Sequence, residues 1–207
     1  MLKVWGRTNS VNVQKVLWCL AEIGIEFERR DAGLEFGIND QDWFLRLNPN
    51  GKVPLLQDDD FALWESNTIV RYLCAKYDLG GLCPISVERR ADAERWMDWA
   101  LSSLARSQAI AFWNLIRTPA AERNMDAVAK AVLETNAAFS ILDRHLATRD
   151  YVIGTELTMG DIPVGAIAHR WFSLEGIERL VWPNLTRWYQ RLAGRSAFQQ
   201  HVMLPLS

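Results

Sequence analysis

The chain is poor in cysteine and histidine and has no long apolar segment. Its three cysteines, Cys19, Cys74 and Cys83, show no C-x-x-C spacing, which fits a reducing compartment and excludes a disulfide framework. The three histidines have no metal-ligand spacing, so we predict no metal site. No apolar run approaches the roughly 20 residues of a membrane span, and the N-terminus lacks the apolar core of a signal peptide. We therefore expect a cytoplasmic protein with no membrane partner.

An excess of charge of either sign is also absent. Lys and Arg number 23 against 25 Asp and Glu, which leaves a net charge of −2. No basic tail or patch stands out along the chain, so a surface that tracks nucleic-acid phosphates is not expected. The 207 residues, of which 49% are hydrophobic, suffice for one large domain or two small ones with a buried core.

Strand and helix signals alternate in residues 1–79. A predicted helix over Asn12–Ile23 has Val13, Val16, Leu17 and Leu20 on one face, and Gly24 ends it. Strands are predicted on both sides of this helix, which gives a βαβ unit with parallel strands. The remaining predicted elements of this α/β domain, in the order βαβ-α-ββα, are the strands Leu2–Trp5 and Ile25–Arg30, a short helix Trp43–Leu47, a hairpin of Val53–Leu56 with Phe61–Trp64, and a helix Ser66–Tyr77.

Beyond Gly80-Gly81-Leu82-Cys83-Pro84 the strand signals disappear. We predict a linker over residues 80–87 and an all-helical domain over residues 88–207. Its predicted helices are Glu88–Arg117, Ala121–Leu146, Asp161–Phe172 and Leu185–Leu192. Thr158-x-x-Asp161 is a capping box that we assign to folding: Thr158 is expected to bond the N3 amide, and the Asp161 carboxylate to bond the Thr158 N–H.

The stretch Asn48-Pro49-Asn50-Gly51-Lys52-Val53-Pro54, with Glu65-Ser66 ten residues further on, carries the most information. Pro54 has no N–H and belongs at a strand start, and Asp58–Asp60 predicts the hairpin loop. Ser66 is placed to accept a bond from the first helical turn, which attracts carboxylates. A free backbone edge at Val53 beside this helix start predicts a site for a short anionic peptide. A hairpin followed by a capped helix explains the same residues without a ligand.

Together these motifs resemble the cytosolic glutathione transferases over essentially the full chain. The resemblance rests on Asn48-Pro49-x-Gly51-x-Val53-Pro54, Glu65-Ser66 and Thr158-x-x-Asp161. It implies a thioredoxin-like domain followed by a helical domain, glutathione as co-substrate, and a homodimer. By the same resemblance the Val53–Pro54 bond is cis, the Val53 backbone pairs with the cysteinyl unit of glutathione, and Glu65 with Ser66 holds the γ-glutamyl end. Lys52 is a candidate for an anionic end of the peptide, with a solvated lysine as the alternative.

The turn Ser10-x-Asn12-Val13-x-Lys15-Val16 is similar to the first turn of the serine-type classes, phi and theta. This similarity implies that Ser10 is catalytic and donates a hydrogen bond to the glutathione sulfur, and it adds Asn12 to the candidate glutathione-binding residues. Ser10 as a simple helix cap is the alternative, and Thr8, Asn9 and Asn12 are polar rivals. No cysteine occupies this turn, so thiol–disulfide exchange is disfavoured.

A small apolar electrophile is the expected second substrate. Its pocket is expected between the first turn and the long second-domain helix, with Ser103, Arg106, Ser107 and Trp113 as candidate wall residues. The expected function is therefore a glutathione transferase. The alternatives are another glutathione-dependent reaction, such as isomerisation or dehalogenation, and a ligand-binding or regulatory protein on the same fold.

Overall fold

The N-terminal sheet has four strands in the order β2-β1-β3-β4. The central strand β1 pairs in parallel with β2 and antiparallel with β3, and β3 pairs antiparallel with β4. The strands are β1 (Leu2–Trp5), β2 (Phe27–Arg30), β3 (Leu55–Asp58) and β4 (Phe61–Trp64). The computed structural model describes residues 1–207 and confirms the predicted βαβ-α-ββα order.

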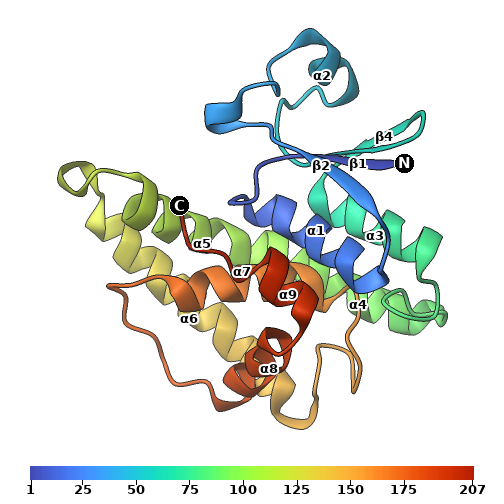
Figure 1. Cartoon of the computed structure of the whole chain (residues 1–207). Coiled ribbons are helices and arrows are strands. Elements are labelled where there is room, and N and C mark those ends of the chain that lie inside the picture. Colours follow the sequence, from blue (N-terminus) through green and yellow to red (C-terminus); the bar gives the residue numbers. More distant parts are fainter.

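Two helices lie against one face of this sheet and separate it from the rest of the molecule (Figure 1). They are α1 (Val11–Ile23), which Gly24 ends at a φ of +79°, and α3 (Ser66–Tyr77). The predicted apolar face of α1 is buried, because it packs between the sheet and the helical domain. The short helices η1 (Leu34–Phe36) and α2 (Asp42–Leu47) lie on the other side of the sheet.

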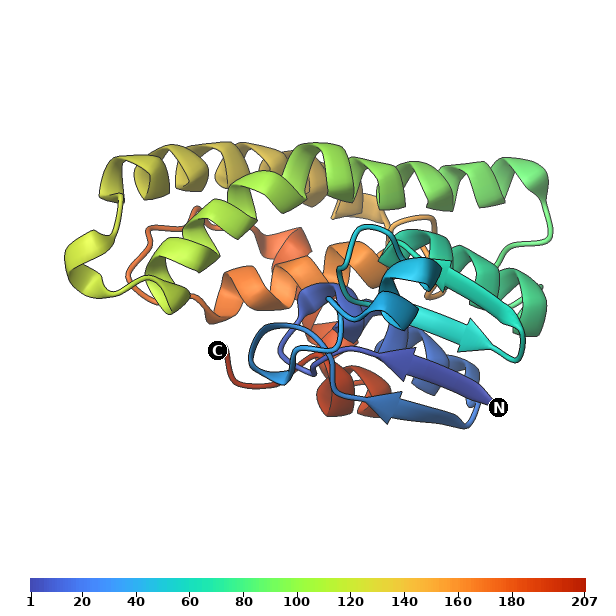
Figure 2. The ribbon, with the colours of Figure 1, turned by 90° about the horizontal axis from the view of Figure 1, so that it is seen from above.

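The second half is all-helical, as expected. Figure 2 shows its long first helix running beside α6 across the whole molecule. This helix is one continuous run in which two π-helical segments interrupt the α-helix: α4 (Val87–Trp99), η2 (Ala100–Leu104), α5 (Ala105–Phe112) and η3 (Trp113–Arg117). The remaining elements are η4 (Ala120–Glu122), α6 (Met125–His145), η5 (Leu146–Thr148), α7 (Asp161–Ser173), α8 (Pro183–Ala193) and α9 (Ser196–His201).

The observed bounds differ from the predicted ones in a few places. Asp58 ends strand β3 instead of opening the loop, because its buried carboxylate accepts hydrogen bonds from Tyr72, Lys76 and Tyr77. Helix α6 starts at Met125, where the Asn124 side chain accepts a bond from the Ala127 N–H. The short helix α9 was not predicted. The division into domains at residues 80–87 stays a prediction; α3 ends at Tyr77 and α4 begins at Val87.

Two predicted caps form differently. The α3 cap position is Glu65, and no side chain caps the helix; Ser66 Oγ instead donates to Asn12 Oδ1 at 3.3 Å. In the second domain, Asp161 accepts from the Thr158 N–H at 3.0 Å as expected. The Thr158 hydroxyl does not bond an amide of the helix: it also donates to Asp161, at 3.3 Å.

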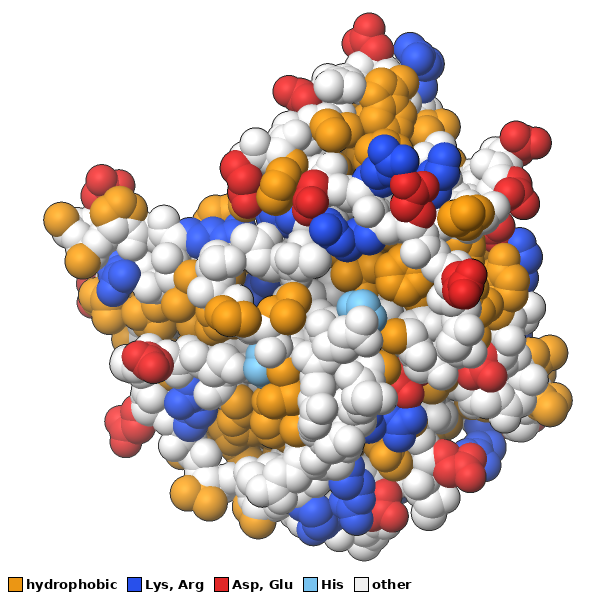
Figure 3. All heavy atoms as spheres, in the orientation of Figure 1, with side chains coloured by type: hydrophobic (Ala, Val, Ile, Leu, Met, Phe, Trp, Pro, Cys, Tyr) orange, Lys and Arg blue, Asp and Glu red, His pale blue; other side chains and the backbone are white.

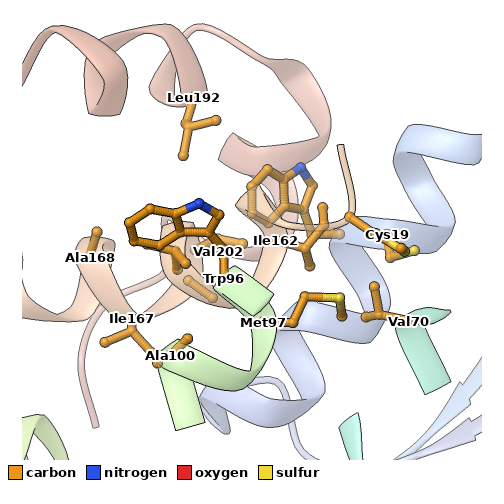
Figure 4. Packing of buried hydrophobic residues seen from close by; sticks show 14 of the residues in the cluster. Cys19, Val70, Trp96, Met97, Ala100, Ile162, Ile167, Ala168, Leu192 and Val202 are labelled. Atoms are coloured by element: carbon orange, nitrogen blue, oxygen red, sulfur yellow. The ribbon is translucent and has the colours of Figure 1, made fainter. Parts of the chain in front are cut away.

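A single hydrophobic core crosses the boundary between the two halves. Its 44 buried residues include Cys19 and Val70 from the sheet domain together with Met97 and Ile162 from the helical domain, and Figure 4 shows these four side chains in one packed group. All three cysteines are buried and free. None of the helices combines the length and apolar character needed to cross a bilayer.

Candidate active site

The turn between β1 and α1 leaves the Ser10 hydroxyl free. Ser10 occupies the cap position of α1 with extended backbone (φ −91°, ψ 119°), and its carbonyl accepts from the Gln14 N–H at 2.9 Å. Its side chain makes no capping bond and is 7% exposed. The hydroxyl lines a cavity of about 450 Å³ between the two domains, which we call the main cavity. The helix-cap alternative for Ser10 is therefore not realised.

The loop before β3 presents an unpaired backbone edge. The Val53–Pro54 peptide bond is cis. Two asparagines hold the preceding turn: Asn48 Nδ2 donates to the Lys52 carbonyl and Asn39 Nδ2 to the Gly51 carbonyl, each at 2.6 Å. The N–H and C=O of Val53 have no partner in the chain, so they are available to an extended peptide.

The start of α3 lies next to this edge. Ser66 is buried, Glu65 is exposed with a φ of +70°, and the first turn of α3 contains no acidic residue. Both residues line a side hollow of about 70 Å³. The side hollow and the main cavity share Asn12, Lys52 and Val53, so a trough leads from Ser10 to Ser66. The structure thus brings all seven predicted site residues together.

Lys15, the basic residue of the first-turn motif, is buried behind the trough, which sequence reasoning did not predict. Its side chain is 1% exposed, and Nζ donates to Asn12 Oδ1 at 2.9 Å. Burial lowers the pKa of Lys15 to about 7. Repulsion by Arg170 adds to this shift, and attraction by Glu65 opposes it. Because Asn12 Oδ1 also accepts from Ser66 Oγ, a chain of hydrogen bonds joins α1 to the start of α3 behind the trough.

The rivals of Ser10 are less available. Thr8 is exposed and does not line the main cavity. Asn9 Nδ2 donates to Ser207 Oγ at 2.9 Å, and Asn12 Oδ1 is occupied by Lys15 and Ser66. Among the hydroxyl side chains of the turn, Ser10 alone lines the main cavity, and its donor is unused.

The long helix supplies the second wall of the main cavity through Ala109, Phe112 and Trp113. Of the predicted wall residues only Trp113 lines it. Arg106 and Ser103 point to solvent, and Ser107 is buried, where it accepts from Thr135 Oγ1 on α6 at 3.0 Å. The residues of the long helix that line the cavity therefore lie nearer its C-terminal end than predicted.

Arginines complete the main cavity, and sequence reasoning missed all three. Arg7 comes from the first turn, Arg117 from the end of η3 and Arg170 from α7. They converge only because the two domains pack together, so no local motif reveals them. A larger groove of about 880 Å³ runs between α7 and residues 203–206, but it contains none of the motif residues.

No group of three or more His, Cys, Asp or Glu side chains is arranged to hold a metal ion. The chemistry available at the trough is therefore that of a hydroxyl, backbone amides, a helix start and several cations. This set suits a peptide with carboxylates at its ends and a nucleophilic group next to Ser10.

Comparisons with known proteins agree with this geometry. The family model for the glutathione S-transferase N-terminal domain matches residues 1–75, and that for the C-terminal domain matches residues 97–196. Glutathione S-transferase GstB of Escherichia coli (strain K12) is 45% identical, with 100% of both chains covered. Glutathione S-transferase 3 of Zea mays is 30% identical over 97% of this chain and 93% of the relative.

A solved structure matches over the whole length as well. It is the theta class glutathione S-transferase of Xanthomonas axonopodis pv. citri with glutathione bound, which has 43% sequence identity and a TM-score of 0.96 and covers 100% of this chain and 99% of its own. These relatives are named as transferases, so the isomerase, dehalogenase and non-catalytic alternatives are not favoured. The chain belongs to the glutathione S-transferase family, and it is a glutathione transferase with glutathione as its co-substrate.

Proposed function

We propose that Ser10 is the residue that activates glutathione, by donating a hydrogen bond from its hydroxyl to the substrate sulfur. The observation that carries this proposal is the unused hydroxyl on the wall of the main cavity, at a helix start where serine commonly caps instead. A hydrogen bond to the thiolate favours the charged form and lowers the thiol pKa.

Glutathione lies along the trough in this proposal. Its cysteinyl unit pairs with the free N–H and C=O of Val53, which directs the sulfur toward Ser10. The γ-glutamyl carboxylate binds at the start of α3 near Ser66, where unpaired N–H groups and the helix dipole favour an anion. Glu65 attracts the γ-glutamyl ammonium, Asn12 lines the floor, and the exposed Lys52 reaches the glycyl carboxylate.

The reaction is a substitution or addition at the electrophile. The thiol proton goes to solvent and the thiolate sulfur forms a bond to an electrophilic carbon. In a substitution the leaving group departs with its electron pair; in an addition the electron pair of the attacked double bond moves onto the acceptor, which takes a proton from solvent. A fall of two pH units in a thiol pKa of about 8.5 raises the thiolate fraction roughly 25-fold at neutral pH, but the less basic sulfur is about 8-fold less reactive. The net gain is only about 3-fold, so positioning the electrophile against the sulfur must supply most of the acceleration.

Substituting Ser10→Ala tests this proposal. We expect ultraviolet titration of the bound thiolate to give a higher pKa than in the wild type, by about one to two pH units, because a hydrogen bond to a charged group contributes about 1.5–3 kcal/mol. Turnover near neutral pH is expected to fall while glutathione still binds. Thr8→Ala is the matched control, since it removes a hydroxyl that is near Ser10 but outside the cavity. An unchanged thiol pKa in Ser10→Ala would assign the role to another group.

The remaining parts of the proposal concern the second substrate, the assembly and the compartment. We propose a small electrophile whose apolar body packs on Trp113 and Ala109. A homodimer is supported by the family and by a hollow of about 380 Å³ beside the exposed Phe61; light scattering should give twice the chain mass of 23.7 kDa. Three buried free cysteines support a reducing compartment, the cytoplasm.

A further inference from the structure

Three guanidinium groups meet in the main cavity, and none of them pairs with an Asp or Glu side chain. Arg7, Arg117 and Arg170 all line it, and none of the eight ion pairs of the chain includes any of them. In Figure 3, Lys and Arg side chains (blue) gather along the step between the sheet domain above and the helical domain below. Unpaired charges in a partly desolvated cavity are costly for a folded protein, so a ligand that neutralises them gains affinity.

The three arginines repel one another. Burial, followed by repulsion from Arg117 and Arg7, lowers the pKa of Arg170 to about 9. Burial and then Arg117 also lower the pKa of Arg7. Glu35, an exposed residue of η1, opposes the shifts of Arg7 and Arg117 but lies in no ion pair with them. The cavity therefore has a positive potential before any substrate enters.

The arginines are held in place by contacts that leave donors unused. Arg170 stacks on the Phe112 ring at 3.9 Å and donates one hydrogen bond, to the Asn9 carbonyl. Arg117 lies over the Trp113 ring at 4.5 Å and bonds the main-chain oxygen of Ser207.

Arg7 also has an unused hydrogen-bond donor: its Nε is buried and donates to no atom of the chain. Since each guanidinium carries five N–H donors, several remain available to the cavity. Planar guanidinium groups bind carboxylate-type anions in bidentate fashion.

Glutathione does not account for this cluster in the binding mode proposed above. One of its carboxylates lies at the start of α3 near Ser66, and the other lies near Lys52. Arg117 and Arg170 line the main cavity from the helical domain, as Phe112 and Trp113 do, which is the side from which the second substrate approaches the sulfur beside Ser10.

We propose that the preferred electrophile of this transferase carries an anionic oxygen group, a carboxylate or a sulfonate, on an aromatic or otherwise apolar body. The inference rests on the proposed function, since it assigns the arginine side of the cavity to the second substrate. The anionic group binds the arginines, and the body packs against the exposed Trp113 and Ala109. The electrophilic carbon is thereby turned toward the glutathione sulfur.

A pair of substrates with one reaction centre tests this inference. In 4-chloro-3,5-dinitrobenzoate and in its methyl ester, the glutathione thiolate attacks the carbon that bears chlorine, a C–S bond forms, and chloride leaves with the C–Cl electron pair. The wild type should show a kcat/KM for the acid at least 10-fold above that for the ester, after correction for the uncatalysed rates. 4-Chloro-3-nitrobenzenesulfonate against the corresponding neutral sulfonamide distinguishes the two kinds of anion.

The Arg117→Met variant locates the effect. Arg117 is half-buried, so this change perturbs the core less than substitution of the stacked Arg170. The acid-to-ester ratio of kcat/KM should fall about 10-fold, because only the acid loses a charge-assisted contact. Arg106→Met, an exposed arginine on the same helix outside the cavity, should keep the wild-type ratio. Thermal midpoints of both variants exclude unfolding as the cause.

Three results would overturn the inference. The first is a wild type that conjugates the ester as well as the acid, and the second is an unchanged acid-to-ester ratio in Arg117→Met. The third is a rise in the KM for glutathione of Arg117→Met that affects both substrates equally, which would assign Arg117 to the tripeptide. Failure of the proposed function looks different: Ser10→Ala would then keep the wild-type pKa of the bound thiol, whatever the acid-to-ester ratio.

Discussion

At the scale of single residues, the buried Lys15 links charge at the site to stability. Its amine lies behind the trough, hydrogen-bonded to Asn12 and almost without contact to solvent. An ordinary lysine stays protonated to about pH 10.4, but this one has a pKa of about 7. The folded apo protein therefore releases a proton that the unfolded chain keeps over the range between these two values.

Stability attributable to Lys15 should rise with pH. Between about pH 7 and 10 the unfolded chain binds more protons at this group than the folded chain, so the free energy of unfolding increases with pH. We expect the wild type to gain about 2 kcal/mol relative to Lys15→Met between pH 7 and pH 9. Urea unfolding of both proteins at the two pH values measures this difference.

The exposed Lys130 of α6 provides the control. Lys130→Met should leave the difference from the wild type independent of pH, because that amine is solvated in the folded protein. Saturating glutathione should reduce the pH-dependent gain of the wild type, since its negative groups favour the Lys15 ammonium. If the free energy of unfolding changed equally for the wild type and Lys15→Met between pH 7 and pH 9, Lys15 would have to stay charged when buried.

Residues also show where sequence reasoning stops. That Ser10, Val53 and Ser66 lie along one trough could be predicted, because they sit in short motifs whose backbone geometry is local; their roles stay predictions. The arginines could not, since Arg7 and Arg170 are separated by most of the chain and meet only after the domains pack. Arg106 illustrates the opposite error: it lies on the expected helix, but the turn geometry directs it to solvent.

At the scale of elements, one buried carboxylate joins three segments of the helical domain. Asp161 at the start of α7 accepts from the Val152 N–H at 2.9 Å, from Trp188 Nε1 of α8 at 2.9 Å, and from the N–H and hydroxyl of Thr158. It is fully buried, and burial raises its pKa to about 6 against the effect of these bonds. The predicted capping box is thus also a tertiary link, which the sequence motif does not reveal.

Asp161→Asn should destabilise the protein by about 1–3 kcal/mol. The amide replaces one accepting oxygen with a donor, so at least one of the buried N–H groups loses its partner. Chemical denaturation of the variant measures the loss, with the exposed Glu134→Gln on α6 as the matched control. Glutathione binding by the folded variant should persist because Asp161 is remote from the trough; a selective loss of binding with unchanged stability would contradict the structural role.

Elements were predicted well where a local signal ends them. Gly24 ends α1, and Thr118-Pro119 ends the long helix, because backbone geometry stops a helix there whatever it packs against. Helix α9 was missed, since six residues carry too little periodicity and its buried Phe198 is explained by tertiary contacts with Trp18, His169 and Tyr189. The π-helical segments η2 and η3 were also missed, because no local composition distinguishes the residues that form them.

At the scale of the whole molecule, the two domains share one core, and the site lies between them. Helix α1 packs on α7, and Arg195 before α9 forms a two-bond ion pair with Glu22 of α1. Movement of one domain relative to the other would displace Ser10 from Phe112 and Trp113. In the proposed binding mode, the interface between domains therefore fixes the distance between the glutathione sulfur and the electrophile, on which most of the acceleration would depend.

Gly165 of α7 tests this interface. A Cβ there would lie 2.7 Å from Leu192 Cδ1 and 3.0 Å from the ring of Trp18, the buried indole of α1. Gly165→Ala should therefore destabilise the protein by about 1–2 kcal/mol, the strain of overpacking less the gain in helix propensity. Gly194→Ala is the control, because its Cβ would meet nothing closer than 3.6 Å, and it should be neutral or slightly stabilising.

Calorimetry should show one transition at a lower temperature for Gly165→Ala, since the core is shared. Two separated transitions would mean that the domains unfold independently. Packing between the domains would then not explain a fixed distance between Ser10 and the second wall of the main cavity.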